Sequence, residues 1–144
     1  MAVGTTKTPW HLWVVGVLSL AWNAMGVWTW QQQVTRAPGY LASMTVEQVR
    51  YIDAAPVWVS VAFGLAVWAG LLGALALLLR RRLAFNAYVA GLIGYLINSG
   101  HAFATGDAAR IMGAGGMAFT ALIFVLCLFE VGYSRWMAKA GVLR

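Results

Sequence analysis

The sequence predicts an all-α protein that lies in a membrane, with four transmembrane helices in an antiparallel bundle. Of its 144 residues, 62% are hydrophobic, and the mean hydropathy is +0.76. Charged residues make up 10% of the chain, whereas a soluble domain usually carries about a quarter. The ten basic and four acidic residues leave four windows without any charge, and these are residues 8–35, 54–79, 83–106 and 111–129.

The charge-free windows place the spans at about residues 10–31, 56–79, 83–104 and 111–133, within one domain of residues 1–144. A helix needs about 20 mainly apolar residues to cross ~30 Å of hydrocarbon, and each window provides them. The runs are continuous, whereas a barrel strand would alternate over about ten residues. The first run extends through Trp30, which makes it too long for the apolar part of a signal peptide.

The external loop between the first two spans, residues 32–55, is predicted to carry a short helix on the membrane surface. Thr45 and Gln48 have the spacing of a capping box, which satisfies two free N–H groups at a helix start. Val46, Val49 and Ile52 follow at helical spacing. They would give this helix one apolar face that lies on the outer interface.

Turn-forming residues separate these elements. Residues 37–39, Ala-Pro-Gly, predict a turn, and residues 105–107, Thr-Gly-Asp, predict a tight turn before the last span. Pro56 is expected in the first turn of the second span, where its missing N–H costs no hydrogen bond. Residues 113–116, Gly-Ala-Gly-Gly, predict a flexible or closely packed start to the last span.

The distribution of charge predicts the orientation. One side of the membrane would contain Lys7, Arg80, Arg81, Arg82, Arg135, Lys139 and Arg144. The other side would contain Arg36, Arg50 and Arg110, offset by Glu47, Asp53 and Asp107. Cytoplasmic loops carry an excess of basic residues, so both termini are expected in the cytoplasm. The basic residues are expected to meet anionic lipid headgroups, and nucleic acid is not an expected partner.

Small and polar residues recur every three or four positions in each span, which predicts that these faces pack inside the bundle. Depth, at ~1.5 Å per residue, divides the polar residues into two clusters. The outer cluster consists of Trp22, Asn23, Asn98 and His101. The inner cluster consists of Asn86 and Glu130 near the cytoplasmic boundary, with His11 at the same level.

Each of these residues has two interpretations. Asn23 and Asn98 either form hydrogen bonds across helices or contact a ligand. His101 is either an interfacial side chain or an acid–base group. Glu130 is the one acid inside a predicted span, where ionisable groups are often functional. It either forms an ion pair with Arg80–Arg82 or Arg135, or binds a proton or substrate.

Sequence motifs for enzyme chemistry are missing, so an enzyme is not favoured. The sequence contains no zinc-binding pattern, nucleophile elbow, phosphate-binding loop or dinucleotide fingerprint. His11 and His101 are expected on opposite sides of the membrane, so they could not hold one haem iron within a chain. Cys127 is expected to be a small packing residue. We therefore expect no cofactor and no metal.

Four segments resemble a family of small bacterial four-span inner-membrane proteins that are sometimes labelled "sugar transporter". The segments are residues 10–16 (WHLWVVG), 20–26 (LAWNAMG), 44–48 (MTVEQ) and 112–119 (MGAGGMAF). The resemblance covers nearly the whole chain and implies a location in the bacterial inner membrane. Residues 28–33 depart from the family, which is expected to carry Tyr and Met-Thr there. The resemblance supplies no set of functional residues.

Three functions remain open. The first is a bundle protein without enzymatic activity, which acts as an accessory, scaffolding or homo-oligomeric subunit and contacts itself or another membrane subunit. The second is a carrier, working as a dimer, for a small neutral polar solute such as a sugar, because Trp22 and the two amides suit hydroxyl groups. The third is a membrane enzyme acting on lipid or quinone, with His101 as its acid–base group.

Overall fold

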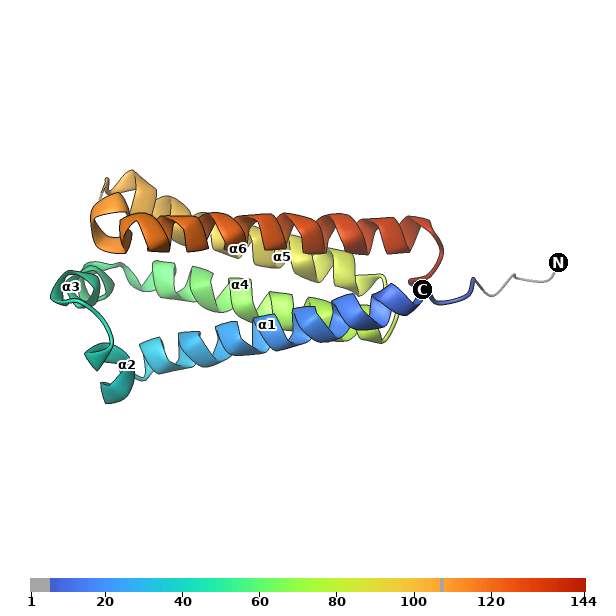
Figure 1. The fold of residues 1–144 in the computed structure, drawn as a ribbon, viewed down its shortest axis with the longest axis horizontal. Coiled ribbons are helices and arrows are strands. Elements are labelled where there is room, and N and C mark those ends of the chain that lie inside the picture. Colours follow the sequence, from blue (N-terminus) through green and yellow to red (C-terminus); the bar gives the residue numbers. More distant parts are fainter. Residues whose placement is uncertain (1–5, 107) are drawn as a thin grey trace.

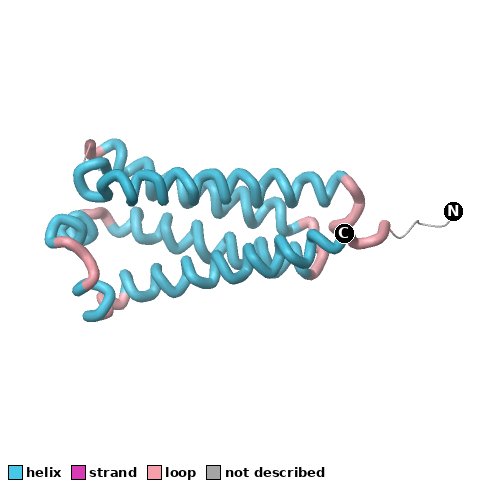
Figure 2. The backbone as a smooth tube through the Cα atoms, viewed as in Figure 1, coloured by secondary structure: helices cyan, strands magenta, loops and turns pink. Residues whose placement is uncertain are grey.

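A computed structural model, which describes residues 6–106 and 108–144, contains four long helices that lie side by side (Figure 1). They are α1 (Trp10–Val34), α4 (Val57–Leu78), α5 (Leu83–Ala104) and α6 (Ala108–Lys139). The short helices α2 (Pro38–Ala42) and α3 (Val46–Ala54) lie at one end, here termed the loop end. The start of α1, the α4–α5 turn and the C-terminus lie at the opposite, terminal end (Figure 1). In the described residues, all regular structure is helical (Figure 2).

Three of the long helices, α1, α4 and α6, are long and apolar enough to cross a membrane. The prediction of an all-α protein is confirmed, and three of its helices have the length and hydropathy of membrane spans. Helix α5 is as long as α4, with 22 residues. It carries Asn86, Asn98 and His101, however, and these polar side chains lower its hydropathy.

The helix bounds agree closely with the predicted spans except at the last helix. Helix α5 occupies residues 83–104 as predicted, and α1 continues to Val34 instead of ending near residue 31. Helix α6 continues to Lys139 instead of ending near residue 133, and a break at Gly113 interrupts its first turns. Gly113 has a φ of 66°, which favours glycine because it has no Cβ. Of the tight turn predicted at 105–107, Asp107 lies outside the described residues.

The short helix predicted in the loop between the first two spans is present as α3. The Gln48 amide N–H donates to the Thr45 hydroxyl at 3.2 Å, and the Gln48 side chain accepts from the Thr45 amide at 3.0 Å, so both capping-box bonds are present. The turn predicted at residues 37–39 is wrong in detail, because Pro38 begins α2. Pro56 lies at the N-cap of α4, one position before the first turn in which it was predicted.

Helices α4 and α5 pack most closely, through glycines of α5. A Cβ added at Gly94 would lie 2.8 Å from the carbonyl oxygen of Ala62 and 2.8 Å from the amide nitrogen of Ala66. Such contacts between backbones are how small residues hold helices together in lipid. Helix α1 packs on α4 and helix α6 packs on α5, whereas α1 and α6 are joined through long side chains.

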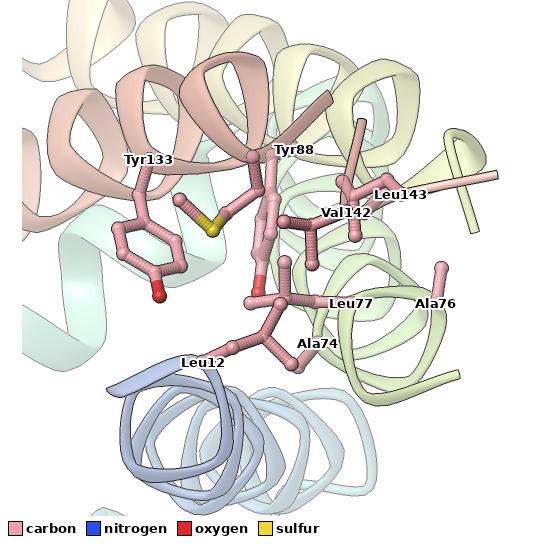
Figure 3. Close-up of a cluster of buried hydrophobic side chains, with 10 residues drawn as sticks. Leu12, Ala74, Ala76, Leu77, Tyr88, Tyr133, Val142 and Leu143 are labelled. Carbon is pink, nitrogen blue, oxygen red and sulfur yellow. The ribbon is translucent and has the colours of Figure 1, made fainter. Parts of the chain in front are cut away.

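The buried hydrophobic cluster lies at the terminal end of the molecule (Figure 3). It consists of Leu12, Ala74, Ala76, Leu77, Ala84, Tyr88, Tyr133, Met137, Val142 and Leu143. The last residues of the chain belong to it because the Arg144 amide donates to Arg80 at 2.7 Å and the Arg144 carbonyl accepts from Arg82 at 2.9 Å. This cluster closes the terminal end, so any interior space must lie toward the loop end.

Candidate functional site

A cavity of about 420 Å³ lies between the four long helices in the half of the molecule nearest the loop end. Apolar side chains form most of its wall, among them Trp22 of α1, Phe63 of α4 and Phe119 of α6. The rings of Trp22 and Phe119 lie 6.0 Å apart and join α1 to α6 across one side of the cavity. A volume of this size and an apolar wall with few polar groups are typical of sites for small molecules.

The structure brings three members of the predicted outer cluster to this cavity. Trp22, Asn23 and Asn98 all line it. His101, the fourth member, is held against Tyr51 of α3, whose hydroxyl lies 2.8 Å from the Nδ1 atom of His101. Tyr51 itself lines the cavity, so His101 lies behind the wall.

Asn98 supplies the cavity with a hydrogen-bond acceptor. Its Nδ2 donates to the Val59 carbonyl oxygen of α4 at 3.1 Å, which fixes the amide across the helix pair. No group in residues 6–106 and 108–144 donates to its Oδ1, and this half-buried side chain borders the cavity. One half of the amide therefore acts as a contact between helices, and the other half remains available to a ligand.

The hydroxyl groups of the cavity wall also present acceptors. Tyr95 donates to the Thr120 carbonyl at 2.7 Å, Ser99 donates to the Tyr95 carbonyl at 2.8 Å, and Thr120 donates to the Gly116 carbonyl at 2.9 Å. Each hydroxyl hydrogen is thus committed to backbone, and only oxygen lone pairs remain. A ligand that donates hydrogen bonds fits this wall better than one that only accepts them.

Below the cavity, toward the terminal end, Glu130 of α6 is held by two neutral donors from α1. The Ser19 hydroxyl donates to Oε1 of Glu130 at 2.6 Å, and Nδ2 of Asn23 donates to the same atom at 2.9 Å. The Ser19 oxygen lies 2.7 Å from the Tyr88 hydroxyl of α5. We refer to Ser19, Asn23, Tyr88 and Glu130 as the carboxylate network.

The carboxylate network differs from the predicted clusters, because Glu130 lies with Asn23 instead of with Asn86. The prediction placed Glu130 about one turn from the end of its span. Since α6 continues to Lys139 at ~1.5 Å per residue, Glu130 is about 14 Å from that end. The expected ion pair with an arginine is also not observed. Among the described residues the salt bridge is that of Arg36 with Asp53.

Asn86 lies instead in a cleft of about 340 Å³ at the terminal end. The cleft is formed by the start of α5 and the end of α6, and Arg82, Arg135 and Lys139 line it with Asn86. Three basic side chains around one polar amide suit an anionic group, such as a lipid phosphate, at the membrane surface.

The two histidines each contact a tyrosine, at opposite ends of the molecule. His11, in the first turn of α1, lies 2.6 Å from the Tyr133 hydroxyl and stacks on Trp136 with an interplanar angle of 7°. His101, in the last turn of α5, contacts Tyr51 and packs edge-on against Trp58. These aromatic contacts fix the two imidazoles at opposite ends of the bundle.

Sequence reasoning did not identify Tyr88, Ser19 or Thr120 as candidate site residues. Ser19 and Asn23 are four residues apart, which places both on one face of α1, so a polar pair was visible. The sequence contained no signal that Glu130 would reach that face. Compared with known proteins, the chain matches no family model, no curated protein and no solved structure.

Proposed function

We propose that this chain is a multi-pass protein of the bacterial inner membrane, with α1, α4, α5 and α6 as four antiparallel spans. The charge at the two ends supports this orientation. Basic residues predominate at the terminal end, where they are Lys7, Arg80, Arg81, Arg82, Arg135, Lys139 and Arg144. By the positive-inside rule this end faces the cytoplasm, and the cleft of Arg82, Arg135 and Lys139 then meets anionic headgroups of the inner leaflet.

The polar residues of α5 do not oppose a fourth span, because each has a place inside the protein. Asn98 donates to Val59 and borders the cavity, and His101 contacts Tyr51. Asn86 lies in the basic cleft at the surface. Polar groups within membrane helices are tolerated when they face the bundle interior or a cavity. Helix α5 therefore meets the requirements of a span despite its lower hydropathy.

Single-cysteine labelling tests the four-span topology, because Cys127 is the one cysteine and Cys127→Ser provides the background. Exposed positions at the two ends are Ser43, Thr105 and Ala140. In spheroplasts, a membrane-impermeant maleimide is expected to label Ser43→Cys and Thr105→Cys. Ala140→Cys should be labelled only after the membrane is permeabilised. Labelling of Ser43→Cys without Thr105→Cys would mean that α5 does not cross.

Within this topology, we propose that the protein carries a small neutral solute that donates hydrogen bonds. The observation that supports this function is the cavity with Trp22, Asn23 and Asn98 in its wall. Aromatic faces pack against the apolar side of such a solute, and the acceptors of Asn98, Ser99 and Thr120 receive its hydroxyl or N–H groups. The resemblance to inner-membrane proteins labelled "sugar transporter" agrees with this choice.

The binding step of this proposal needs one chain, since all four long helices of one chain form the cavity. The hydrophobic cluster closes the terminal end, so the bound solute would face the loop end and the periplasm. Release to the cytoplasm requires this cluster to open. Many carriers achieve that change with two repeated halves. We therefore propose a dimer as the transporting unit.

A second candidate function, a homo-oligomeric or accessory subunit, is favoured by the outer face of α6. No residue of its most apolar stretch is buried, and Leu122, Val125 and Phe129 are exposed. This face contacts either lipid or another subunit. The mass of the protein in lipid nanodiscs distinguishes the two functions when it is combined with solute uptake, because a subunit assembles without uptake.

Replacing Asn98 with leucine is expected to reduce saturable uptake of 4-nitrophenyl glucoside into proteoliposomes by about fivefold or more. The glucoside combines an aromatic ring with donor hydroxyls, and loss of one buried hydrogen bond costs about 1–3 kcal/mol. The matched control is Asn86→Leu, the same change on the same helix but outside the cavity. Equal effects of the two substitutions, or no saturable uptake of neutral sugars and glycosides by the unaltered protein, would contradict the proposal.

A further inference from the structure

Glu130 is the one acidic side chain among the described residues of the four long helices. Its Oε1 accepts hydrogen bonds at 2.6 Å from Ser19 and at 2.9 Å from Asn23, and both donors are neutral. The salt bridge found in residues 6–106 and 108–144 joins two other residues, Arg36 and Asp53, at the loop end. The carboxylate is thus held inside the bundle by hydrogen bonds alone.

The carboxylate lies near mid-height in the bundle. Its partner Asn23 is close to the middle of α1, which contains residues 10–34, and only 7% of Asn23 is exposed. Across the bundle, Asn23 packs against Gly70, near the middle of α4, where an added Cβ would collide with Oδ1 of Asn23. Ionisable groups at this depth in membrane proteins commonly mark ion pathways and proton relays.

The carboxylate network is directly connected to the cavity. Asn23 lines the cavity and also donates to Glu130, and Cys127, one turn before Glu130 on α6, lines the cavity too. When Glu130 is ionised, Ser19 directs its single hydrogen to the carboxylate. Tyr88 must then donate to Ser19, because the Ser19 hydrogen is already used. The donors of two helices, α1 and α5, therefore all depend on the charge of one side chain on α6.

The groups that surround Glu130 on every packed element can be named. Helix α5 contributes the Tyr88 hydroxyl, which reaches the carboxylate through Ser19, and α6 itself contributes Cys127. The Tyr133–His11 pair lies one turn closer to the terminal end and joins α6 to α1. Helix α4 contributes no titratable side chain along its whole length. Glu130 is therefore the one carboxylate in this set of titratable groups.

We propose that Glu130 binds a proton and that this protonation is coupled to occupation of the cavity, so that solute and proton move together. This inference rests on the proposed carrier function. The step is the transfer of one proton from a hydronium ion to the carboxylate, which gives a neutral carboxyl group and a water molecule. The Ser19 hydrogen and the Asn23 amide are then released from an anion. Asn23 can turn its N–H₂ group into the cavity, where it contacts the solute.

Coupling through Asn23 has a reciprocal consequence. If protonation of Glu130 changes the affinity of the cavity for a solute, then the solute changes the proton affinity of Glu130 by the same factor. A neutral Glu130 also removes the charge that ties α1 to α6. The proton thus acts at the contact between α1 and α6 that must loosen when the terminal end opens.

Infrared spectroscopy of the solute-free protein in lipid tests the proton site by itself. As the pH is lowered, the C=O stretching band of a protonated carboxyl group that is shielded from water is expected to grow. The variant Glu130→Gln is expected to lose that band. The matched control is Glu47→Gln, on the exposed surface of α3, which should retain it. If Glu130→Gln does not fold, Glu130→Asp should keep the band at a displaced frequency. A titration that is identical in the unaltered protein and in Glu130→Gln overturns the proposal.

Uptake of 4-nitrophenyl glucoside into proteoliposomes tests the coupling. An inward proton gradient is expected to raise the initial rate several-fold in the unaltered protein and in Glu47→Gln. In Glu130→Gln the rate should be independent of the gradient, while equilibrium exchange of the glucoside persists. A gradient effect that survives in Glu130→Gln would overturn coupling. Absence of uptake at any pH would contradict the carrier function, and the infrared result would still decide whether Glu130 binds a proton.

Discussion

Replacing Asn23 with leucine is expected to prevent stable folding, and not to remove solute binding selectively. Nδ2 of Asn23 donates to Glu130 at 2.9 Å and to the Ser19 carbonyl at 2.9 Å, so leucine would remove two bonds in the bundle interior. A hydrogen bond to a charged group contributes about 1.5–3 kcal/mol. The leucine methyl groups would also meet Gly70, which packs directly on the amide. The measurements are the monodisperse fraction in mild detergent and the thermal unfolding temperature.

The matched comparison is Asn98→Leu, which removes one amide bond, to Val59, from a half-buried position at the cavity wall. This variant should remain folded, with a smaller fall in unfolding temperature. A second comparison is the double variant that combines Asn23→Leu with Glu130→Gln. A neutral side chain at position 130 does not need the hydrogen-bond donors that the carboxylate needs. The double variant should recover part of the lost stability, as residues in one network do not act additively. Equal stability of the two leucine variants would contradict this account.

The expected results distinguish Asn23 from Asn98, two residues to which the sequence analysis gave the same interpretations. The sequence placed both at similar depth on interior faces, and both line the cavity in the structure. Depth follows from the rise per residue, which is nearly constant in a helix, and was therefore predictable. The rotation of each helix about its axis determines which group an amide meets. Rotation depends on packing against three neighbours, and a single sequence does not specify it.

The error at Glu130 has a similar origin. The hydropathy of the last span falls at Ser134 and Arg135, and the prediction ended the helix there. The observed helix continues to Lys139 because the following residues are strong helix formers and Met137, at 2% exposure, packs into the core. Hydropathy predicts where the hydrocarbon ends, whereas propensity and packing determine where the helix ends. The bounds of α5 were predictable because charged and turn residues bracket it on both sides.

The C-terminal residues were assigned to a basic tail, and their burial was not predicted. Val142 and Leu143 are 4% and 1% exposed. Two apolar residues between Gly141 and Arg144 are too few to show the periodicity of a helix or a strand. Gly141 has a φ of 74°, which allows the chain to turn back after α6. The backbone pairing of Arg144 with Arg80 and Arg82 then holds the segment against the α4–α5 turn. Long-range pairing of this kind is visible only in three dimensions.

Replacing Leu143 with alanine is therefore expected to destabilise the protein by about 2–5 kcal/mol, the range for buried leucine-to-alanine changes. Leu143 belongs to the same buried cluster as Leu12, Leu77 and Met137, which lie on three different long helices, so its truncation leaves a void in the core that joins α1, α4 and α6. Burial in this cluster places Leu143 among tightly packed neighbours, where little relaxation can fill the space. The measurement is the free energy of unfolding in mixed micelles of mild and denaturing detergent.

The matched control is Leu79→Ala, the same chemical change at the same end of the molecule. Leu79 is 71% exposed, so this substitution removes few protein contacts and should cost well under half as much. The contrast also bears on function, because the cluster around Leu143 is what closes the cavity toward the terminal end. If Leu143→Ala and Leu79→Ala have the same stability, the C-terminal segment does not cover the core. If only Leu143→Ala is destabilised, the last residues of the chain hold the terminal end shut, and the opening step of the proposed carrier must begin by releasing them.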